Sequence, residues 1–307
     1  MNFEYSESGF EKMMKFREAA TSGEFPNLLR ADYKDILLSA YGQVPLTLFD
    51  LCYVVDSNNP SETYRGLTDL GPTTQIVPEG GEFPERKLSE KDTETIYNRK
   101  YGDIVSYTRE MEIYNKLGEF KRLAEFQGQA LASGLEENLA DCIETSGNYT
   151  AYGSSISLNR ANLEAMINKF NTQTTTDAEG RTVDLGLKAD TLLVPPDLEF
   201  EARRLLQSAQ IPGSANNDIN VLQGGLKLVV CRALASSSIF YILKAKCPVG
   251  LIYQKVIGPP PETFVQNVAR EQVSDTVFRY DKISFRADMI YGLGVLDAKT
   301  ILKSYSS

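Results

Sequence analysis

Histidine and tryptophan are both absent from the 307 residues of this chain. Without histidine there is no Ser-His-Asp triad, no Cys-His pair, and neither the most frequent general base nor the most frequent zinc ligand. The four cysteines lack CxxC spacing, and three lie in apolar neighbourhoods that suit a buried thiol. We therefore expect free thiols and no disulfides.

Long apolar runs and an excess of positive charge are also missing. No run approaches the roughly eighteen apolar residues of a membrane-spanning helix, and the first residues lack the basic and apolar regions of a secretory signal. The net charge is −9, from 32 basic and 41 acidic residues mixed along the chain. No basic face favours phosphates, so we predict a cytoplasmic location, no membrane partner and no sequence-specific nucleic-acid binding.

What is present suffices for a globular protein with a protruding start. With 42% hydrophobic residues, the chain can bury the core of one large domain or of two smaller ones. Residues 1–55 look like a helical or irregular arm, because short apolar bursts are interrupted by Gly23, Pro26, Gly42 and Pro45. These bursts are too small to form a core alone, so we expect the arm to lie against something else.

Residues 56–108 differ from the rest of the chain in composition. Prolines and glycines punctuate a polar stretch, and the alternation of Ile96, Ile104 and Val105 with polar residues predicts extended strand. We interpret the segment as a long hairpin with a poorly ordered tip. Such a hairpin has too few core-forming side chains to be stable alone, so something outside it must cover it.

Helices and strands alternate through the remaining sequence. Apolar residues at three- and four-residue steps predict a long helix over about 117–145, and a cap-like start predicts another over about 159–171. The stretch KADTLLVPPDLEFEARRLLQSAQ predicts a strand, a turn and a helix. LKLVVCRAL, SIFYILKAKCP and VGLIYQKVI predict strands, and imperfect alternation near the end predicts a long strand with a bulge.

Candidate catalytic groups have simpler explanations. Asp197, Glu199 and Glu201 lie in the first helical turn after two prolines, where the helix dipole favours each negative charge by about 0.3–1 kcal/mol. An acid/base pair is the functional alternative, but Asp197 and Glu199 would point in different directions on a helix. We therefore predict no catalytic residues.

The glycine and serine motifs are equally weak. GLGVLD, residues 292–297, lacks the third glycine of a dinucleotide fingerprint, and we interpret it as a turn. LQGGLKL predicts a Gly-Gly turn before a strand. Ser236, Ser237 and Ser238 have neither a GxSxG elbow nor a histidine to activate them. We predict no cofactor and no metal site.

Taken in order, these parts resemble the major capsid proteins of tailed phages with the Hong Kong 97-type fold, particularly the Mu-like head-subunit branch. The resemblance covers essentially the whole chain. Its most specific pieces are VPEGGEFPERKLSEKDTETIYNRKYGDIVSYTREME, similar to the family's extended loop and return strand, and KADTLLVPPDLEFEARRLL, similar to part of its axial domain. It implies an α+β fold, a structural role and no enzymatic activity.

The resemblance implies a place for each segment. These are an N-terminal arm at 1–55, an extended loop at 56–108, a peripheral domain with a spine helix at 109–147, an axial domain at 148–268, and a returning strand at 269–307. Tyrosines in the loop suit burial against a neighbouring chain better than stacking on nucleotides, because interleaved arginines are missing. We predict inter-subunit contacts at Glu79, Glu82, Glu85, Arg86, Lys87, Tyr97 and Tyr101.

The resemblance further implies hexamers and pentamers in an icosahedral shell around packaged double-stranded DNA, assembled in the cytoplasm of a bacterial host. An arm and a hairpin that cannot bury themselves agree with this, because heterologous contacts close into rings and shells. The expected partners are other copies of the chain, a separate scaffold protein, a portal and a decoration protein. The acidic surface is tolerable, since a motor would drive the DNA inside.

Covalent crosslinking is not expected. Lys87 and Lys91 would supply an amine, but no asparagine follows Asn267, and Lys282 lies roughly where the acceptor would be. Non-covalent loop contacts or a decoration protein would then stabilise the shell. No obvious scaffolding extension precedes the arm, and the start at Met1 favours a separate scaffold over a removed extension.

Two alternatives remain open from the sequence. An encapsulin-type shell of the same fold would enclose an enzyme cargo, although the longer arm and loop favour a virus. A histidine-free α/β enzyme or ligand-binding protein would use carboxylates near Asp197. That protein would be a monomer or a small oligomer with a pocket, whereas a capsid subunit would form very large particles.

Overall fold

The structure is a computed structural model that describes residues 25–67, 77–82, 90–108, 114, 117–153, 156–176, 181–210, 219–265 and 282–304. The chain divides into two compact units. The first comprises Met1–Pro45, Lys100–Gly134 and Ile257–Ile290, and the second comprises Leu46–Arg99, Leu135–Val256 and Tyr291–Ser307. None of the described helices is both long and apolar enough to span a membrane.

The first unit contains helix α2 (Phe25–Gln43) and most of helix α4 (Leu117–Glu144). The two helices approach closely at Gly128, where an added Cβ would lie 2.4 Å from the carbonyl oxygen of Leu37. Tyr33 of α2 stacks on Phe285, with ring centroids 4.3 Å apart, and its hydroxyl donates to Gln127 of α4. The expectation that the arm lies against something else is therefore confirmed for α2, while residues 1–24 lie outside the described residues.

The second unit contains a five-stranded sheet in the order β5-β13-β10-β8-β9. Its strands are β5 (Thr150–Tyr152), β8 (Thr191–Val194), β9 (Lys227–Val230), β10 (Tyr241–Leu243) and β13 (Ile301–Ser304). Strand β10 is antiparallel to β8 and β13, whereas β8 pairs with β9 in parallel and β13 pairs with β5 in parallel. All four residues of β8 are buried, as the apolar run predicts.

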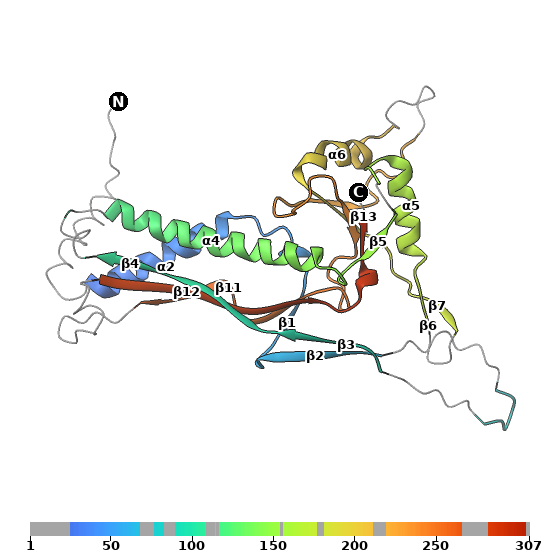
Figure 1. Ribbon diagram of the computed structural model, residues 1–307, viewed down its shortest axis with the longest axis horizontal. Helices are drawn as coiled ribbons and strands as arrows, with labels where there is room; N and C mark the ends of the chain where they lie inside the picture. The colour runs from blue at the N-terminus through green and yellow to red at the C-terminus, as the bar shows by residue number, and fades with distance from the viewer. Residues whose placement is uncertain are drawn as a thin grey trace. The chain divides into compact units, whose positions relative to one another are not determined.

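Helices α5 (Arg160–Asn171) and α6 (Glu199–Gln207) pack with this sheet around one core (Figure 1). Leu163, Met166 and Phe170 supply the buried face of α5, at three- and four-residue spacing. Ala202 and Leu206 supply that of α6. The predicted strand-turn-helix is confirmed, with the 3-10 turn η2 (Pro196–Leu198) linking β8 to α6.

A four-stranded sheet has the order β1-β11-β12-β4. Its strands are β1 (Tyr53–Asp56), β4 (Arg99–Thr108), β11 (Leu251–Val265) and β12 (Lys282–Val295). Two hairpins complete the strands, β2 (Ser61–Leu67) with β3 (Glu90–Tyr97), and β6 (Thr174–Thr176) with β7 (Thr182–Asp184). Short 3-10 helices occur at η1 (Phe49–Leu51) and η3 (Ala298–Thr300).

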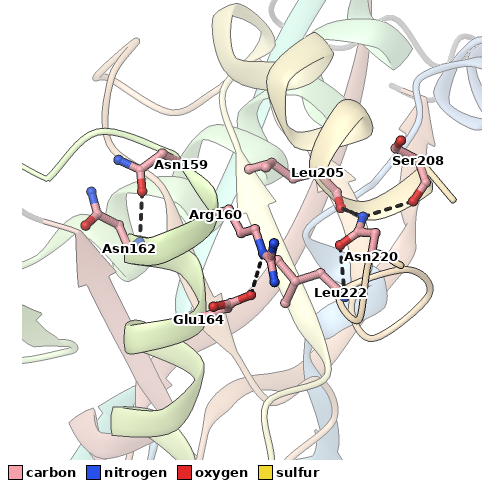
Figure 2. Close-up of polar contacts among 8 residues, drawn as sticks. All are labelled: Asn159, Arg160, Asn162, Glu164, Leu205, Ser208, Asn220 and Leu222. Atoms are coloured by element: carbon pink, nitrogen blue, oxygen red, sulfur yellow. Dashed lines mark hydrogen bonds and ion pairs between the residues drawn. The ribbon is translucent and has the colours of Figure 1, made fainter. Parts of the chain in front are cut away.

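Both predicted helix boundaries agree with the structure to within a residue or two. Helix α5 begins after Asn159, whose side-chain oxygen accepts from the backbone N–H of Asn162 at 2.9 Å (Figure 2). Helix α4 ends at Glu144, and Asn148 satisfies one of its last carbonyls by donating to Cys142 at 2.7 Å. Gly147 has φ 101°, a conformation that favours glycine, in the turn that brings Asn148 there.

Two further predictions have different outcomes. All four cysteines are free, and Cys52, Cys231 and Cys247 are buried, which confirms the prediction of free thiols. The interpretation of GLGVLD as a turn is wrong, because Gly292 to Val295 lie inside strand β12. The glycines serve a close contact with Ile96, which is described with the hairpin below.

The two central glycines of α4 provide opposite tests of helix packing. Gly128→Ala should destabilise the subunit by about 1–3 kcal/mol, because the new methyl group would overlap the α2 backbone. Gly134→Ala should stabilise it by about 0.5–1 kcal/mol, because no atom beyond the local helix backbone lies within 4 Å of its Cβ position and alanine favours the helix. Urea unfolding of unassembled subunits measures both, and changes of the same sign would contradict the described helix contact.

Glu136 is a buried carboxylate that holds the start of η1. It accepts hydrogen bonds from the Thr47 hydroxyl at 2.8 Å and from the Leu48 N–H at 3.1 Å. Burial raises the pKa of Glu136 above its ordinary value of 4.5, and the nearby Asp50 charge acts in the same direction, although these hydrogen bonds oppose the shift. The folded state therefore holds this proton more tightly than the unfolded state does.

That difference predicts a pH dependence of stability. Between the ordinary and the raised pKa, the unfolded state is ionised and the folded state keeps its proton, so rising pH removes stability. The free energy of unfolding of the wild type, minus that of Glu136→Gln, should fall as the pH rises from about 4 to about 8. Paired urea titrations check this, and a difference that stays constant with pH would argue against the raised pKa.

Candidate assembly surfaces

The β2–β3 hairpin is a two-stranded sheet of its own within the second unit. Its antiparallel register runs from Ser61 opposite Tyr97 to Leu67 opposite Glu90, with an irregularity between Arg65 and Gly66. The predicted hairpin is thus confirmed for Ser61–Leu67 and Glu90–Tyr97, whereas Arg99–Thr108, predicted as part of it, forms β4 of the four-stranded sheet. Residues 68–76 and 83–89 lie outside the described residues, and the poorly ordered tip stays a prediction.

The predicted contact residues fall into three groups. Tyr97 is 62% exposed at the end of β3, and Glu79 and Glu82 are also exposed. Tyr101 is half-buried and lies in β4, so it belongs to the four-stranded sheet rather than to the hairpin. Glu85, Arg86 and Lys87 lie outside the described residues.

The break between β3 and β4 occurs at Asn98, which ties the base of the hairpin together. Its N–H donates to the Pro60 carbonyl at 2.9 Å, and its side-chain amide donates to Asn59 O at 2.7 Å and to Ser57 Oγ at 3.1 Å. The Ser57 N–H in turn donates to the carbonyl of Lys255 in β11 at 2.9 Å. Backbone and side chain together fix the point where the hairpin leaves the four-stranded sheet.

Tyr64 of β2 and Ile96 of β3 contact strands of the four-stranded sheet. Gln254 of β11 is fully buried and donates to the hydroxyl of Tyr64 in β2 at 2.7 Å. Ile96 of β3 is 2% exposed and lies over Gly292 and Gly294 of β12. A side chain at either glycine would overlap Ile96, which is why this part of β12 is glycine-rich without being a turn.

A second surface lies at the end of α6, where Ile219 and Val221 are 79% and 74% exposed. Between them Asn220 is buried, and its amide donates to the carbonyls of Leu205 at 2.7 Å and Ser208 at 2.9 Å (Figure 2). These bonds satisfy carbonyls that the helix end leaves unpaired. This surface was not predicted from the sequence. Its signal in the sequence is the pattern apolar–polar–apolar at Ile219, Asn220 and Val221, shortly after a predicted helix.

The carboxylates near Asp197 lie at the start of α6. Asp197 is exposed, and Glu199 forms an ion pair with Arg203 at 2.7 Å, one helical turn away. Ion pairs of this spacing at the surface stabilise helices by a few tenths of a kcal/mol, and this stabilisation accounts for the pair. Among the described residues, no group of three or more acidic or cysteine side chains is suited to a metal ion.

Comparison with known proteins identifies the relatives of this arrangement. The family described as phage capsid protein matches residues 92–304, more than half of the chain. The capsid of the Cyanophage P-SCSP1u has a similar structure, with a TM-score of 0.55 and 14% identity over 84% of this chain and 87% of that one. A search of curated protein sequences finds no match.

Two further structures of similar fold come from shells of other kinds. The virus-like particle from Pyrococcus furiosus has a TM-score of 0.54 and 12% identity over 92% of this chain and 99% of that one. The SrpI encapsulin of Synechococcus elongatus PCC 7942 has a TM-score of 0.53 and 10% identity over 86% and 88%. These likenesses show the fold, and the family match shows the membership. The chain belongs to the phage capsid protein family and has the Hong Kong 97-type fold.

Proposed function

We propose that copies of this chain assemble into hexamers and pentamers of an icosahedral phage shell that encloses double-stranded DNA. The observation that carries the proposal is the hairpin's lack of burial. Of its described side chains, only Ile96 is buried. A two-stranded hairpin is marginally stable in water, so its strands need cover from a neighbouring copy.

The exposed side chains of the hairpin suit such a contact. Tyr97 presents a large exposed ring with a hydroxyl, and tyrosine is enriched in the buried cores of protein interfaces. Glu79 and Glu82 lie on the described part of the loop and would determine the register between copies. Glu85, Arg86 and Lys87 belong to the same proposed contact.

The segments have the following places in this proposal. Residues 1–55, which include α2, are the N-terminal arm, and 56–108 are the extended loop. Residues 109–147 are the peripheral domain with α4 as its spine, 148–268 are the axial domain, and 269–307 return through the peripheral domain. We also keep the Mu-like branch as a prediction.

The proposed setting follows from the shell. The chain would reside in the virion capsid after assembly in the cytoplasm of a bacterial host. Its other partners would be a scaffold, a portal and a decoration protein, and it would have no catalytic role. The net charge of −9 gives the shell no general affinity for DNA, so packaging would depend on a motor.

An encapsulin-type compartment is the second candidate, favoured by the similarity to the SrpI encapsulin. The family match to phage capsid proteins favours the virus. Expression of the chain, followed by negative-stain microscopy, tests both. Shells or capsomer rings are the expected result, and a discrete monomer with no larger species would overturn the proposal. Particles from infected cells would contain DNA for a phage, and an enzyme cargo for a compartment.

A matched pair of tyrosine substitutions tests the hairpin contact. Tyr97→Ser should reduce shell yield by about tenfold or more, because it removes an exposed ring at every subunit contact. Tyr114→Ser removes a ring outside the hairpin that is 72% exposed, and it should leave the yield closer to the wild type. Sucrose-gradient sedimentation measures the yield, and circular dichroism checks that both subunits fold. Equal yields from the two variants would exclude Tyr97 from the contact.

A further inference from the structure

The contact of Ile96 with two glycines of β12 is closer than ordinary packing. A Cβ built on Gly294 would lie 2.6 Å from Cδ1 and 2.7 Å from Cγ1 of Ile96. A Cβ built on Gly292 would lie 2.9 Å from Cγ2 of the same side chain. We call Gly292 and Gly294 the glycine notch.

Backbone conformation does not explain the notch. Glycine inside a strand weakens it, by roughly 0.5–1 kcal/mol relative to alanine, and is usually justified by a left-handed φ or by a close neighbour. Neither Gly292 nor Gly294 is among the described glycines with positive φ. Close neighbours are therefore the reason for two glycines in three residues: Ile96 at Gly294, and Ile96 together with Asn98 and Gln254 at Gly292.

The notch also determines which face of β3 points outward. Successive side chains of a strand point to opposite faces, so burial of Ile96 commits Tyr97 to the exposed face. A register slip of one residue would direct Tyr97 at the notch, where its larger ring does not fit the space that Ile96 occupies. The bond from Gln254 to Tyr64 holds the partner strand β2 in the same register.

We propose that the packing of Ile96 against the glycine notch fixes the orientation of the hairpin. Gly292, Gly294 and Ile96 are then positioning residues for shell assembly. By fixing the inward face of β3, they present Tyr97 to a second copy of the chain. This inference rests on the proposed function, and it adds the device that orients the loop. These residues would affect assembly without touching the neighbouring copy themselves.

The two glycines differ in their surroundings, which gives a sharp test. The three heavy atoms nearest to the Cβ position at Gly294 all belong to Ile96. The Cβ position at Gly292 also lies 2.7 Å from Asn98 Oδ1 and 2.8 Å from Gln254 Oε1. Truncation of Ile96 should therefore make room for a methyl group at Gly294 but not for one at Gly292.

The experiment measures amide hydrogen exchange of residues 93–97 in unassembled subunits. Gly294→Ala should raise the exchange rate by about tenfold or more, and adding Ile96→Ala should bring it back to within about threefold of Ile96→Ala alone. Gly292→Ala should raise the rate similarly, and Ile96→Ala should not restore it. Gly134→Ala is the matched glycine control, with no change expected at these amides.

Shell yield of the same variants provides the second measurement, and it should follow the exchange rates in rank. The proposed packing of Ile96 against the two glycines would be overturned by either of two results. One is that the effects of Ile96→Ala and Gly294→Ala on the exchange rate are additive, and the other is that Ile96→Ala restores the rate equally in both glycine variants. Normal shells from a Gly294→Ala subunit with a loosened hairpin would overturn its role in assembly. Failure of the wild type to form any shell would refute the proposed function instead, and the exchange measurement would still decide whether the notch holds the hairpin.

Discussion

The burial available to the β2–β3 hairpin is the constraint on which the rest of this structure depends. Two short strands offer little apolar surface, and among their described residues only Ile96 is removed from solvent within the subunit. One side chain supplies about 1.5–3 kcal/mol at most, which is small beside the entropy of ordering the strands. Within the subunit, hydrogen bonds from Asn98 and Gln254 hold the base of the hairpin, and its outer face stays exposed.

The absence of a side chain permits close contacts at Gly128 and at the glycine pair of β12. At Gly128 the absence of a Cβ lets α4 approach the α2 backbone, and at Gly292 and Gly294 it lets Ile96 lie on β12. Glycine is intrinsically unfavourable in the interior of a helix or strand, and at each of these positions the close contact offsets that cost. The same substitution elsewhere in α4, at Gly134, meets no neighbour. Position in the packed structure, and not residue type, decides the effect of a glycine.

Periodicity was sufficient to predict the helices and the buried strand. The repeat in 117–145 and the cap at Asn159 act through neighbours three or four residues away, so the local sequence contains them. GLGVLD was misread because turns and close contacts use the same glycines, and the deciding neighbour, Ile96, is distant in sequence. Glu136 and Asn220 were missed for the same reason: their partners, Thr47 and Leu205, are identified only by the fold. The hairpin was predicted correctly, but the division at Asn98 that assigns Tyr101 to the other sheet was not.

Sequence identities of 10–14% with shells of three kinds show how little of the sequence the fold requires. A buried β8, the apolar faces of α5 and α6, and an amphipathic α4 can be built from many combinations of residues. Assembly restricts the sequence more than folding does. The same contact is repeated throughout a shell, so a small misalignment in one subunit recurs in every copy. In the assembly proposed above, the orientation of the hairpin would depend on a few buried residues such as Ile96, and the contact itself would depend on exposed residues such as Tyr97. Selection for a shell should therefore act on both sets, although only the second would touch a neighbour.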